Sequence, residues 1–528
     1  MSSRLPDKNR SPAWALALVL LLLALALHLR FVQHAGGLWR DEANLANLAS
    51  RSSLAGMAHD NFPVLMPLLV HAWQQVFGPS DTALRWLGAV IGLGLVAALF
   101  AAAMLLRRAP PLIALALLAL NPVLLFYGDS LRAYGLGSLA VALAFAAAWA
   151  LLQKPTGLRT AAFALAATAS VQALFQNSVL ILAICAGAFA VCARRKDLRT
   201  ALKILAGGVI AALSLLPYLP GLRNAPQSAV NLRSGFQPDV IWDNLQTALG
   251  FPLPQYLWVW LALTLIVLLG YLCKHKDAAE PAVFAAITLL VALGTFAAFL
   301  WFAQLPTQQW YFLPIMTLAV AAFDAALPPL PKSFHAAAFG LVAATAVAGA
   351  PFAWRATAQR FTNIDLLARQ VAATAVPGDC VVVSPWYLGI SFDRYFHAHI
   401  PWTTLPPLSD HSGHRYDLVR EQMRNPATLQ PVFDQISATL RHGHRVWVVG
   451  WMQPAGDGPM PPSLPQPPLK YTGWADTPYA LRWDSQTSWF LRQNSTNFAH
   501  LKIPDPGDVN HDEDLQLLAA SGWRTNAP

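Results

Sequence analysis

Long apolar runs separated by short polar linkers fill the first two-thirds of the chain, between Ala13 and Ala353. A helix that crosses a bilayer needs about 20 apolar residues, and most of these runs are of that length. We therefore expect about eleven transmembrane helices, with the region near 160–193 counting either as two helices or as one tilted span. The expected spans are 13–32, 82–106, 111–127, 133–152, 160–175, 177–193, 201–221, 254–273, 281–303, 308–328 and 334–353.

The pattern changes after Trp354, where the chain becomes polar and rich in proline. Two helix–turn–strand units are expected there, which together predict a small α/β domain. The expected helices are 364–375 and 431–440, and the expected strands are 380–384 and 445–450. The polar stretch 495–528 is expected to be partly loose. The chain is thus predicted to hold a transmembrane body, 1–354, and a soluble α/β domain, 355–528.

Composition supports a membrane protein and argues against nucleic acid as a partner. Hydrophobic residues make up 55% of the chain and charged residues only 12%, whereas soluble proteins are about 25% charged. The net charge of +9 comes from cations in the short linkers between apolar runs, where topology requires them. The four cysteines follow no metal-ligand or disulfide spacing. The first apolar run lacks a small-residue cleavage site, so we interpret it as a retained helix rather than a signal peptide.

The distribution of lysine and arginine predicts the orientation in the membrane. Alternate linkers hold most of the cations, for example Arg107 and Arg108, or Arg194, Arg195 and Lys196. By the positive-inside rule these linkers and the N-terminus are cytoplasmic. With an odd number of spans, the C-terminal domain is then expected on the outer side.

The first outer loop holds two adjacent acidic residues, Asp41 and Glu42. Apolar residues at helical spacing follow them, which predicts an amphipathic helix on the outer membrane surface. Acids in a first helical turn also complement the helix dipole, so a purely structural role remains open. The chemical alternative is a carboxylate base, which transfer of a sugar from a phosphate carrier to a hydroxyl requires.

The second outer loop holds Asp129 and Arg132, two charged residues in an otherwise apolar hairpin. Their spacing allows an ion pair within one helical turn, which would let both groups tolerate the membrane interface. A role in a functional site is the alternative.

These segments resemble a known family. The run Gly37-Leu-Trp-Arg-Asp-Glu-Ala and the later run Gln74 to Arg85 resemble membrane glycosyltransferases of the GT-C fold, in particular the bacterial protein-mannosyltransferase and aminoarabinose-transferase group (glycosyltransferase family 39-like). In that family an Asp-Glu motif in the first outer loop holds the catalytic Asp. The resemblance implies that Asp41 is the base and that Glu42 is its neighbour in the site.

The second outer loop resembles the family's aromatic-rich turn with an acid, an Arg and a Tyr. Arg132 and Tyr134 match that pattern, whereas Asp129 stands one residue earlier than the family's acid. The resemblance implies that Arg132 contacts the donor phosphate or orients Asp41 through the acidic residue.

Weaker matches suggest further donor contacts. The segment 307–314 resembles a late outer motif of the family, although the usual basic residue is missing, and a pair of interface aromatics is an equally good interpretation. His59 and Asp60 lie near the position of a family histidine, where a solvated loop is the simpler interpretation. Four histidines, at 411, 414, 442 and 444, follow no zinc spacing and are interpreted as scattered surface residues. The candidate donor contacts are Arg40, Arg223, Arg233, Gln309 and Tyr311.

The resemblance implies an inverting transfer of one sugar from a polyprenyl-phosphate-linked donor to an acceptor hydroxyl on a lipid, glycan or protein. The reaction would occur at the outer face of the bacterial inner membrane, with the C-terminal domain in the periplasm as an acceptor-binding or lid module. A divalent cation, Mg²⁺ or Mn²⁺, is left open as a cofactor. Two alternatives remain: a transporter or flippase for lipid-linked sugars, which favours mid-bilayer charges and repeated halves, and a non-catalytic receptor.

Overall fold

The computed structural model describes ten segments of the chain, which form two compact units. The described residues are 11–57, 62–220, 236–250, 253–274, 279–304, 307–326, 332–452, 458–467, 475–503 and 505–524. The first unit is built from described residues within 11–34, 62–220 and 236–358, and the second from those within 35–57 and 359–524. The sequence predicts a boundary at residue 354. The contacts divide the chain at residue 358 and also place the first loop in the second unit.

Eight helices among the described residues of the first unit are long and apolar enough to cross a membrane. They are α1 (Ser11–His34), α5 (Asp81–Arg107), α7 (Ala133–Gln153), α9 (Asn177–Arg195), α10 (Leu198–Leu213) with its continuation through η2 (Leu216–Tyr218), α13 (Gln255–Lys274), α14 (Glu280–Ala303) and α16 (Lys332–Ala356). The chain is therefore a multi-pass membrane protein, as predicted.

The three remaining expected spans are shorter helices. They are α8 (Gly157–Ala173), α15 (Leu313–Ala326) and the segment 111–127, which divides into α6 (Leu112–Leu117) and the π-helical turn η1 (Leu124–Gly128). The division has a local cause, because the Asn121 side chain accepts hydrogen bonds from the backbone N–H groups of Val123 and Leu124 at 2.8 and 3.1 Å. Pro122 follows and has no N–H with which to continue a helix. The region 160–193 forms two helices, which decides between the two alternatives for that region.

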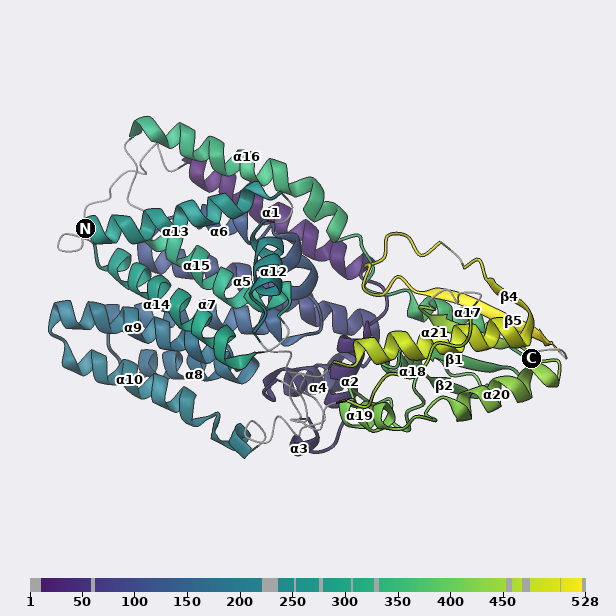
Figure 1. The fold of residues 1–528 in the computed structure, drawn as a ribbon. Helices are drawn as coiled ribbons and strands as arrows, with labels where there is room; N and C mark the ends of the chain where they lie inside the picture. The colour runs from purple at the N-terminus through teal and green to yellow at the C-terminus, as the bar shows by residue number, and fades with distance from the viewer. Residues whose placement is uncertain are drawn as a thin grey trace. The chain divides into compact units, whose positions relative to one another are not determined.

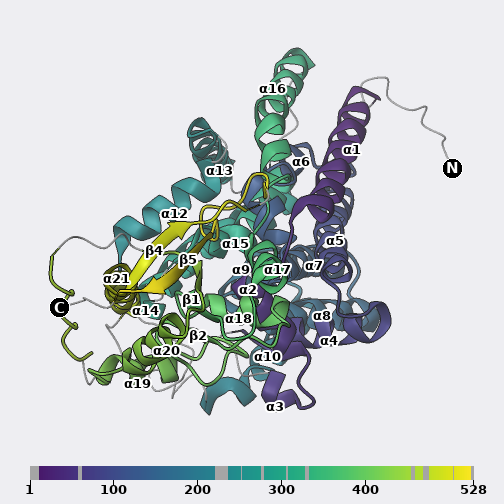
Figure 2. The same ribbon diagram turned by 90° about the vertical axis from the view of Figure 1, so that its right-hand side faces the viewer.

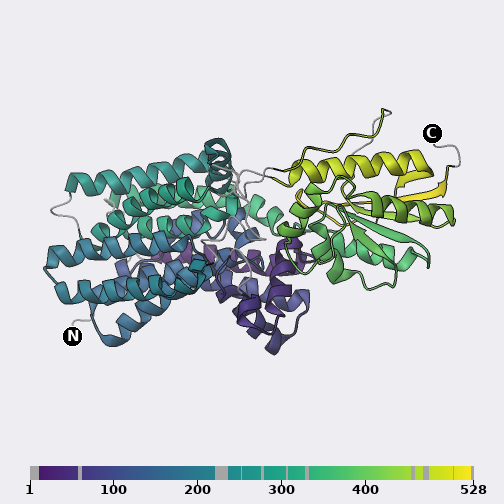
Figure 3. The ribbon, with the colours of Figure 1, turned by 60° about the horizontal axis from the view of Figure 1, so that its bottom comes forward.

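The long helices of the first unit lie side by side (Figures 1 and 3), and α7 packs against α5, α8, α9 and α15. In its most apolar window 72% of α7 is buried inside the protein, against 17% of α13, so α13 presents most of its surface outward. Packing is closest between α9 and α14. A Cβ atom at Gly187 of α9 would lie 2.1 Å from the Thr288 hydroxyl, so only glycine fits there. The unit also contains α4 (Leu65–Phe77), α12 (Pro238–Gly250) and η4 (Gln309–Phe312).

The second unit is an α/β domain around a five-stranded sheet of order β2-β1-β3-β5-β4. The strands are β1 (Cys380–Ser384), β2 (Trp402–Thr404), β3 (Val446–Gly450), β4 (Ser495–His500) and β5 (Gln516–Trp523). The first three are parallel, and β5 runs antiparallel to both β3 and β4. The predicted strands at 380–384 and 445–450 and the predicted helices at 364–375 and 431–440 are confirmed.

Helices cover both faces of this sheet (Figure 2). Alternate residues of a strand point to opposite faces. Val382 accordingly packs with α19 (Tyr416–Arg424), α20 (Gln430–Arg441) and α21 (Thr477–Asn494). Val381 packs with α17 (Ile364–Thr374) and α18 (Leu388–Tyr395) on the other face. Two separate hydrophobic cores result, one on each side of the sheet.

The segment 495–528, which the sequence predicts to be partly loose, contains two strands in its described part. About half of the segment's described residues form β4 and β5, which pair through Asn497 with Ser521 and Ala499 with Ala519. Few apolar residues stabilise these strands. Leu517 of β5 is buried in the core on one face of the sheet, and Leu518 and Ala520 are buried in the core on the other face. The many polar residues around them conceal this pattern in the sequence.

The first loop forms helix α2 (Arg40–Ala49), which begins close to the predicted position and packs inside the second unit. The backbone N–H of Leu38 donates to the hydroxyl of Tyr395 at 2.6 Å, and the Asn47 side chain donates to the carbonyl of Ser412 at 3.2 Å. Most of its ten residues are buried, so α2 does not present the broad polar face that the sequence predicts. Helix α2 packs instead against α18 and against the loop that precedes α19.

Candidate active site

Asp41 lies in the first turn of α2 and is hydrogen-bonded to a histidine far away in the sequence. Its Oδ1 atom is 3.1 Å from Nε2 of His414, and the two side chains are 18% and 13% exposed. The carboxylate is therefore partly shielded but still reachable by a ligand. The interpretation of His414 as a scattered surface residue is wrong, because its ring is mostly buried against the candidate base.

The loop before α19 holds His414 in place. The ring of His414 meets the face of Trp386 edge-on at 6.2 Å between centroids and stacks on Tyr416 at 6.0 Å. Arg415 binds the carboxylates of Asp410 and Asp417 on either side, which closes this loop on itself. The ring of the candidate histidine thus has little freedom to turn.

Close approach between this loop and α2 depends on Gly413. A Cβ atom at this position would lie 2.6 Å from Oδ1 of Asn44 on α2, well inside van der Waals contact. A larger residue here would require the Asn44 side chain or the histidine loop to shift.

Trp386 is hydrogen-bonded to a buried carboxyl group. The indole Nε1 of Trp386 donates to Oδ2 of Asp476 at 2.9 Å, immediately before α21 begins. Burial raises the pKa of Asp476, although the hydrogen bond from Trp386 acts in the opposite direction. His414 therefore interacts with two acidic side chains, with Asp41 through a hydrogen bond and with Asp476 electrostatically.

Arg40, next to Asp41, is engaged by Glu513. Its Nη1 lies 2.9 Å from Oε1 of Glu513, and its guanidinium lies 4.6 Å from the centre of the Tyr387 ring. Burial alone would lower the pKa of Arg40, but the carboxylates of Glu513 and Asp41 outweigh burial and raise it. Burial raises the pKa of Glu513 to about 7, with the attraction to Arg40 acting against the shift. Arg40 thus stays charged beside Asp41 but is held by a buried partner rather than free to reach a donor.

Glu42 differs from Asp41 in exposure. Successive residues of an α-helix are about 100° apart, so neighbours project in different directions. Glu42 is fully buried in the second unit, whereas part of the Asp41 side chain remains accessible. Of the two acids, Asp41 is the one that a substrate can contact.

In the first unit, Asp129 is buried beside His28 of α1. Oδ2 of Asp129 is 2.5 Å from Nδ1 of His28, and both side chains are almost fully buried. Two glycines of α5 make room for this pair: a Cβ at Gly92 would lie 2.1 Å from Oδ1 of Asp129, and one at Gly88 would lie 1.8 Å from its carbonyl. The suggested ion pair between Asp129 and Arg132 is corrected here, since Asp129 is hydrogen-bonded to His28 of α1 instead.

Four of the predicted residues come together in an aromatic cluster of the first unit. The Arg132 guanidinium lies 4.6 Å from the ring centre of Phe62, and Phe62 meets Tyr134 edge-on at 5.6 Å. Tyr134 lies 5.6 Å from Tyr311. Gln309 donates to the Tyr127 hydroxyl at 3.2 Å, and Tyr127 packs on Trp310 at 4.4 Å. The structure therefore joins the second loop to the 309–312 turn, two segments that the sequence separates by about 180 residues.

The residues predicted for the site are divided between the two units. Arg40, Asp41 and Glu42 belong to the second unit, and Asp129, Arg132, Tyr134, Gln309 and Tyr311 belong to the first. The positions of His59, Asp60, Arg223 and Arg233 lie outside the described residues.

A divalent cation would need several ligands that lie close together in the described residues. Mg²⁺ and Mn²⁺ favour several oxygen ligands around one point. Within the described segments, no three His, Cys, Asp or Glu side chains gather closely enough to hold such an ion. Asp41 and Asp129 each have one histidine partner instead. The side chains of the described residues do not by themselves fit a divalent cation, and we assign no chemical step to one.

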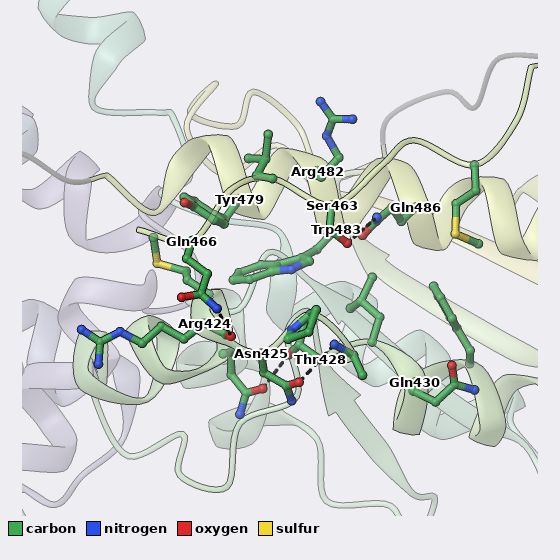
Figure 4. Close-up of a pocket in the computed structure, with 18 residues that line it drawn as sticks. Arg424, Asn425, Thr428, Gln430, Ser463, Gln466, Tyr479, Arg482, Trp483 and Gln486 are labelled. Atoms are coloured by element: carbon green, nitrogen blue, oxygen red, sulfur yellow. Dashed lines mark hydrogen bonds between the residues drawn. The ribbon is translucent and has the colours of Figure 1, made fainter. Parts of the chain in front are cut away.

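A cavity of about 240 Å³ lies in the second unit between α21 and the turn that links α19 to α20 (Figure 4). The proline-rich segment 458–467, called the strap below, also lines this cavity. Four donors on one face of α21 bind carbonyl groups of this strap: Tyr479 to Pro465, Arg482 to Pro462, Gln486 to Pro461 and Trp489 to Gly458. Tyr479, Arg482 and Gln486 line the cavity while they bind the strap, and polar residues of the turn between α19 and α20, among them Asn425 and Thr428, line its opposite side.

Comparisons with known proteins identify the fold. No protein-family model and no curated protein matches the sequence. The structure is similar to the oligosaccharyltransferase of Archaeoglobus fulgidus in its apo form, with a TM-score of 0.51 and 12% identity, covering 82% of this chain and 69% of that one. It is also similar to ArnT from Cupriavidus metallidurans in the apo state, with a TM-score of 0.49 and 14% identity, covering 83% of this chain and 93% of that one. ArnT bound to undecaprenyl phosphate gives a TM-score of 0.48 and 15% identity, covering 83% of this chain and 92% of that one.

The likeness to the archaeal oligosaccharyltransferase, at 12% identity, is a likeness of fold. The chain has the predicted GT-C-like architecture: an α-helical polytopic body with a C-terminal α/β domain.

Proposed function

We propose that this chain is a membrane glycosyltransferase of the GT-C type, which transfers one sugar from a polyprenyl-phosphate-linked donor to an acceptor hydroxyl with inversion. The observation that carries the proposal is the position of Asp41. It lies in the loop that follows the first membrane helix, as a partly accessible carboxylate, in a chain that shares its fold with an oligosaccharyltransferase. A carboxylate in that loop matches the base that this reaction requires.

In the proposed reaction Asp41 acts as a general base. The acceptor oxygen forms a bond to the anomeric carbon of the donor sugar while its proton moves to the Asp41 carboxylate. The bond between the anomeric carbon and the phosphate oxygen breaks at the same time, and the polyprenyl phosphate leaves with the electron pair. Attack on the face opposite the leaving group inverts the configuration at the anomeric carbon.

The leaving phosphate needs positive charge or hydrogen-bond donors to stabilise it. We assign this role to Arg132, whose guanidinium is held over the ring of Phe62 in the aromatic cluster. Tyr134, Gln309 and Tyr311 of the same cluster are proposed contacts of the donor sugar, because aromatic rings and amides are suited to a ligand that is polar at its edges and apolar on its faces. Glu42 is buried next to Asp41 and is proposed to act only through its neighbour.

The proposed location follows from the distribution of charge. Cations gather in alternate linkers, which favours a cytoplasmic N-terminus and a C-terminal domain on the outer side. We propose the bacterial inner membrane, with the C-terminal domain in the periplasm. The partners are then the lipid-linked donor, an acceptor lipid, glycan or protein, and the surrounding membrane lipids.

The test uses the purified full chain in proteoliposomes with a pool of polyprenyl-phosphate sugars and membrane acceptors, and follows transfer by mass spectrometry. Replacing Asp41 with Asn removes the base with little change in size, so transfer should fall by a factor on the order of 100 or more. Asp434→Asn, an exposed acid on α20, is the matched control and should keep the parent's rate. Equal transfer by the Asp41→Asn and parent proteins would exclude Asp41 as the base. Absence of transfer by the parent with every donor would refute the proposed function.

A further inference from the structure

The Asp41 carboxylate needs help to hold one orientation. A side chain in the first turn of a helix that is partly exposed can occupy more than one rotamer. A base that takes a proton from a bound hydroxyl must instead present one oxygen at a fixed position. In this chain, Oδ1 of Asp41 accepts a hydrogen bond from Nε2 of His414. That bond restricts the orientation of the carboxylate.

The proton arrangement follows from the chemistry of the two groups. An ionised carboxylate can only accept hydrogen bonds, so Nε2 of His414 carries a proton when Asp41 is charged. A donor to a carboxylate stabilises its charged form, which is the form a general base needs. His414 therefore favours the working state of Asp41 both in geometry and in charge.

His414 is itself rigidly supported. Trp386 and Tyr416 pack against its ring, and Gly413 lets its loop approach α2 closely. The titratable groups that interact with it come from three elements: Asp41 on α2, Asp476 before α21, and Tyr416 at the start of α19. A histidine on a rigid loop can keep a carboxylate in one orientation, whereas a histidine on a mobile loop would move together with the carboxylate.

We infer that His414 is a positioning residue of the transfer reaction, which holds the Asp41 carboxylate ionised and oriented toward the acceptor hydroxyl. This inference rests on the proposed function. It gives the C-terminal domain a direct part in the chemistry, because its loop between β2 and α19 supplies the histidine. Neither the spacing of the histidines nor the resemblance to GT-C enzymes assigns this residue.

The test compares three variants of the full chain in proteoliposomes, with transfer rates measured over a range of donor and acceptor concentrations and of pH. His414→Ala removes the donor. His414→Gln keeps an N–H donor of similar reach on a more flexible side chain. His411→Gln changes a histidine of the same loop that packs on Trp402 instead. Loss of a partner that orients a reactive group typically costs roughly 10- to 100-fold in activity. We expect a fall in kcat of that order for His414→Ala, partial recovery in His414→Gln, and the parent's rate in His411→Gln.

The pH profile and the Michaelis constants separate a positioning role from a structural one. Without the His414 donor, Asp41 holds its proton more strongly, so the acid limb of the kcat profile should move to higher pH in His414→Ala. The KM values for donor and acceptor should stay within about twofold, since substrate binding is not the step affected. An unmoved acid limb, or a loss confined to KM, would overturn the inference. So would a His414→Ala protein with the parent's kcat while Asp41→Asn is inactive, an outcome that leaves the proposed function standing.

Discussion

The buried Glu513, which pairs with the partly exposed Arg40, makes the stability of the second unit depend on pH. Burial raises the pKa of Glu513 from 4.5 to about 7, although Arg40 opposes the shift. In the folded protein Glu513 therefore keeps its proton up to a higher pH than in the unfolded chain. Between about pH 4.5 and 7 the unfolded state binds fewer protons, so the free energy of unfolding falls as pH rises. Above about pH 7 Glu513 is ionised in both states, and its contribution no longer changes.

The size of this effect follows from the shift. One pKa unit corresponds to about 1.4 kcal/mol, so a shift of about 2.5 units gives roughly 3 kcal/mol between the two ends of the window. For a domain of this size each kcal/mol moves Tm by about 2–4 °C. The Tm of the second unit should thus fall by roughly 6–12 °C from the acid to the neutral end of the window because of this one group.

Glu513→Gln removes the titration while keeping the shape of the side chain. The assay is thermal unfolding of the detergent-solubilised full chain at several pH values between 5 and 8, followed by intrinsic fluorescence. The variant should lose most of the slope of Tm against pH that the parent shows, while Asp476 contributes equally to both and cancels in the comparison. Glu421→Gln, an exposed acid on α19, serves as the control and should keep the parent's slope. Identical slopes in the parent and Glu513→Gln proteins would refute the reasoning, because Glu513 would then be ionised throughout.

Two glycine contacts give further tests. Gly92→Ala places a methyl group 2.1 Å from Oδ1 of Asp129, whereas in the control Gly94→Ala the methyl group meets its nearest neighbour at an ordinary 3.4 Å. Overpacking predicts that the free energy of unfolding falls by about 1–3 kcal/mol in Gly92→Ala only. The effect is measured as a lower Tm in detergent, and equal Tm values in the two variants would contradict it. Gly413→Ala brings a methyl group against the Asn44 side chain of α2 and should lower the transfer rate. The control Gly458→Ala, whose methyl group meets nothing within 4 Å, should leave the rate unchanged. Equal rates for the two variants in proteoliposomes would show that the close approach of the histidine loop to α2 is not needed.

The sequence predicts those parts of the fold that depend on local patterns. Apolar runs of membrane length identify the eight long helices, and the valine-rich segments 380–384 and 445–450 identify two strands. The patterns fail where one or two residues decide the outcome. Asn121 and Pro122 divide an apolar run that looks continuous, and a few buried residues turn the polar segment near 516–523 into a strand.

The candidate site shows the same limit. The motif around Asp41 and the aromatic residues of the second loop and the 309–312 turn can be found from local sequence. His414 cannot, because hydrogen-bond partners 373 residues apart are set by tertiary packing rather than by any spacing. The one sequence signal was the density of polar residues in Asp410-His-Ser-Gly-His-Arg-Tyr-Asp, which also suits an ordinary surface loop. Only the fold distinguishes the two.

The grouping of α2 with the C-terminal domain has a consequence for the order of events during synthesis. Chains grow at about 5–20 residues per second. Asp41 and His414 are 373 residues apart, so roughly 20–75 s pass between the synthesis of the two. During that interval α2 exists without the sheet and helices that bury it, while the intervening membrane helices are being made. The hydrogen bond between Asp41 and His414 is thus among the late contacts to form, and no ribosome-bound chain that ends before residue 414 can contain it.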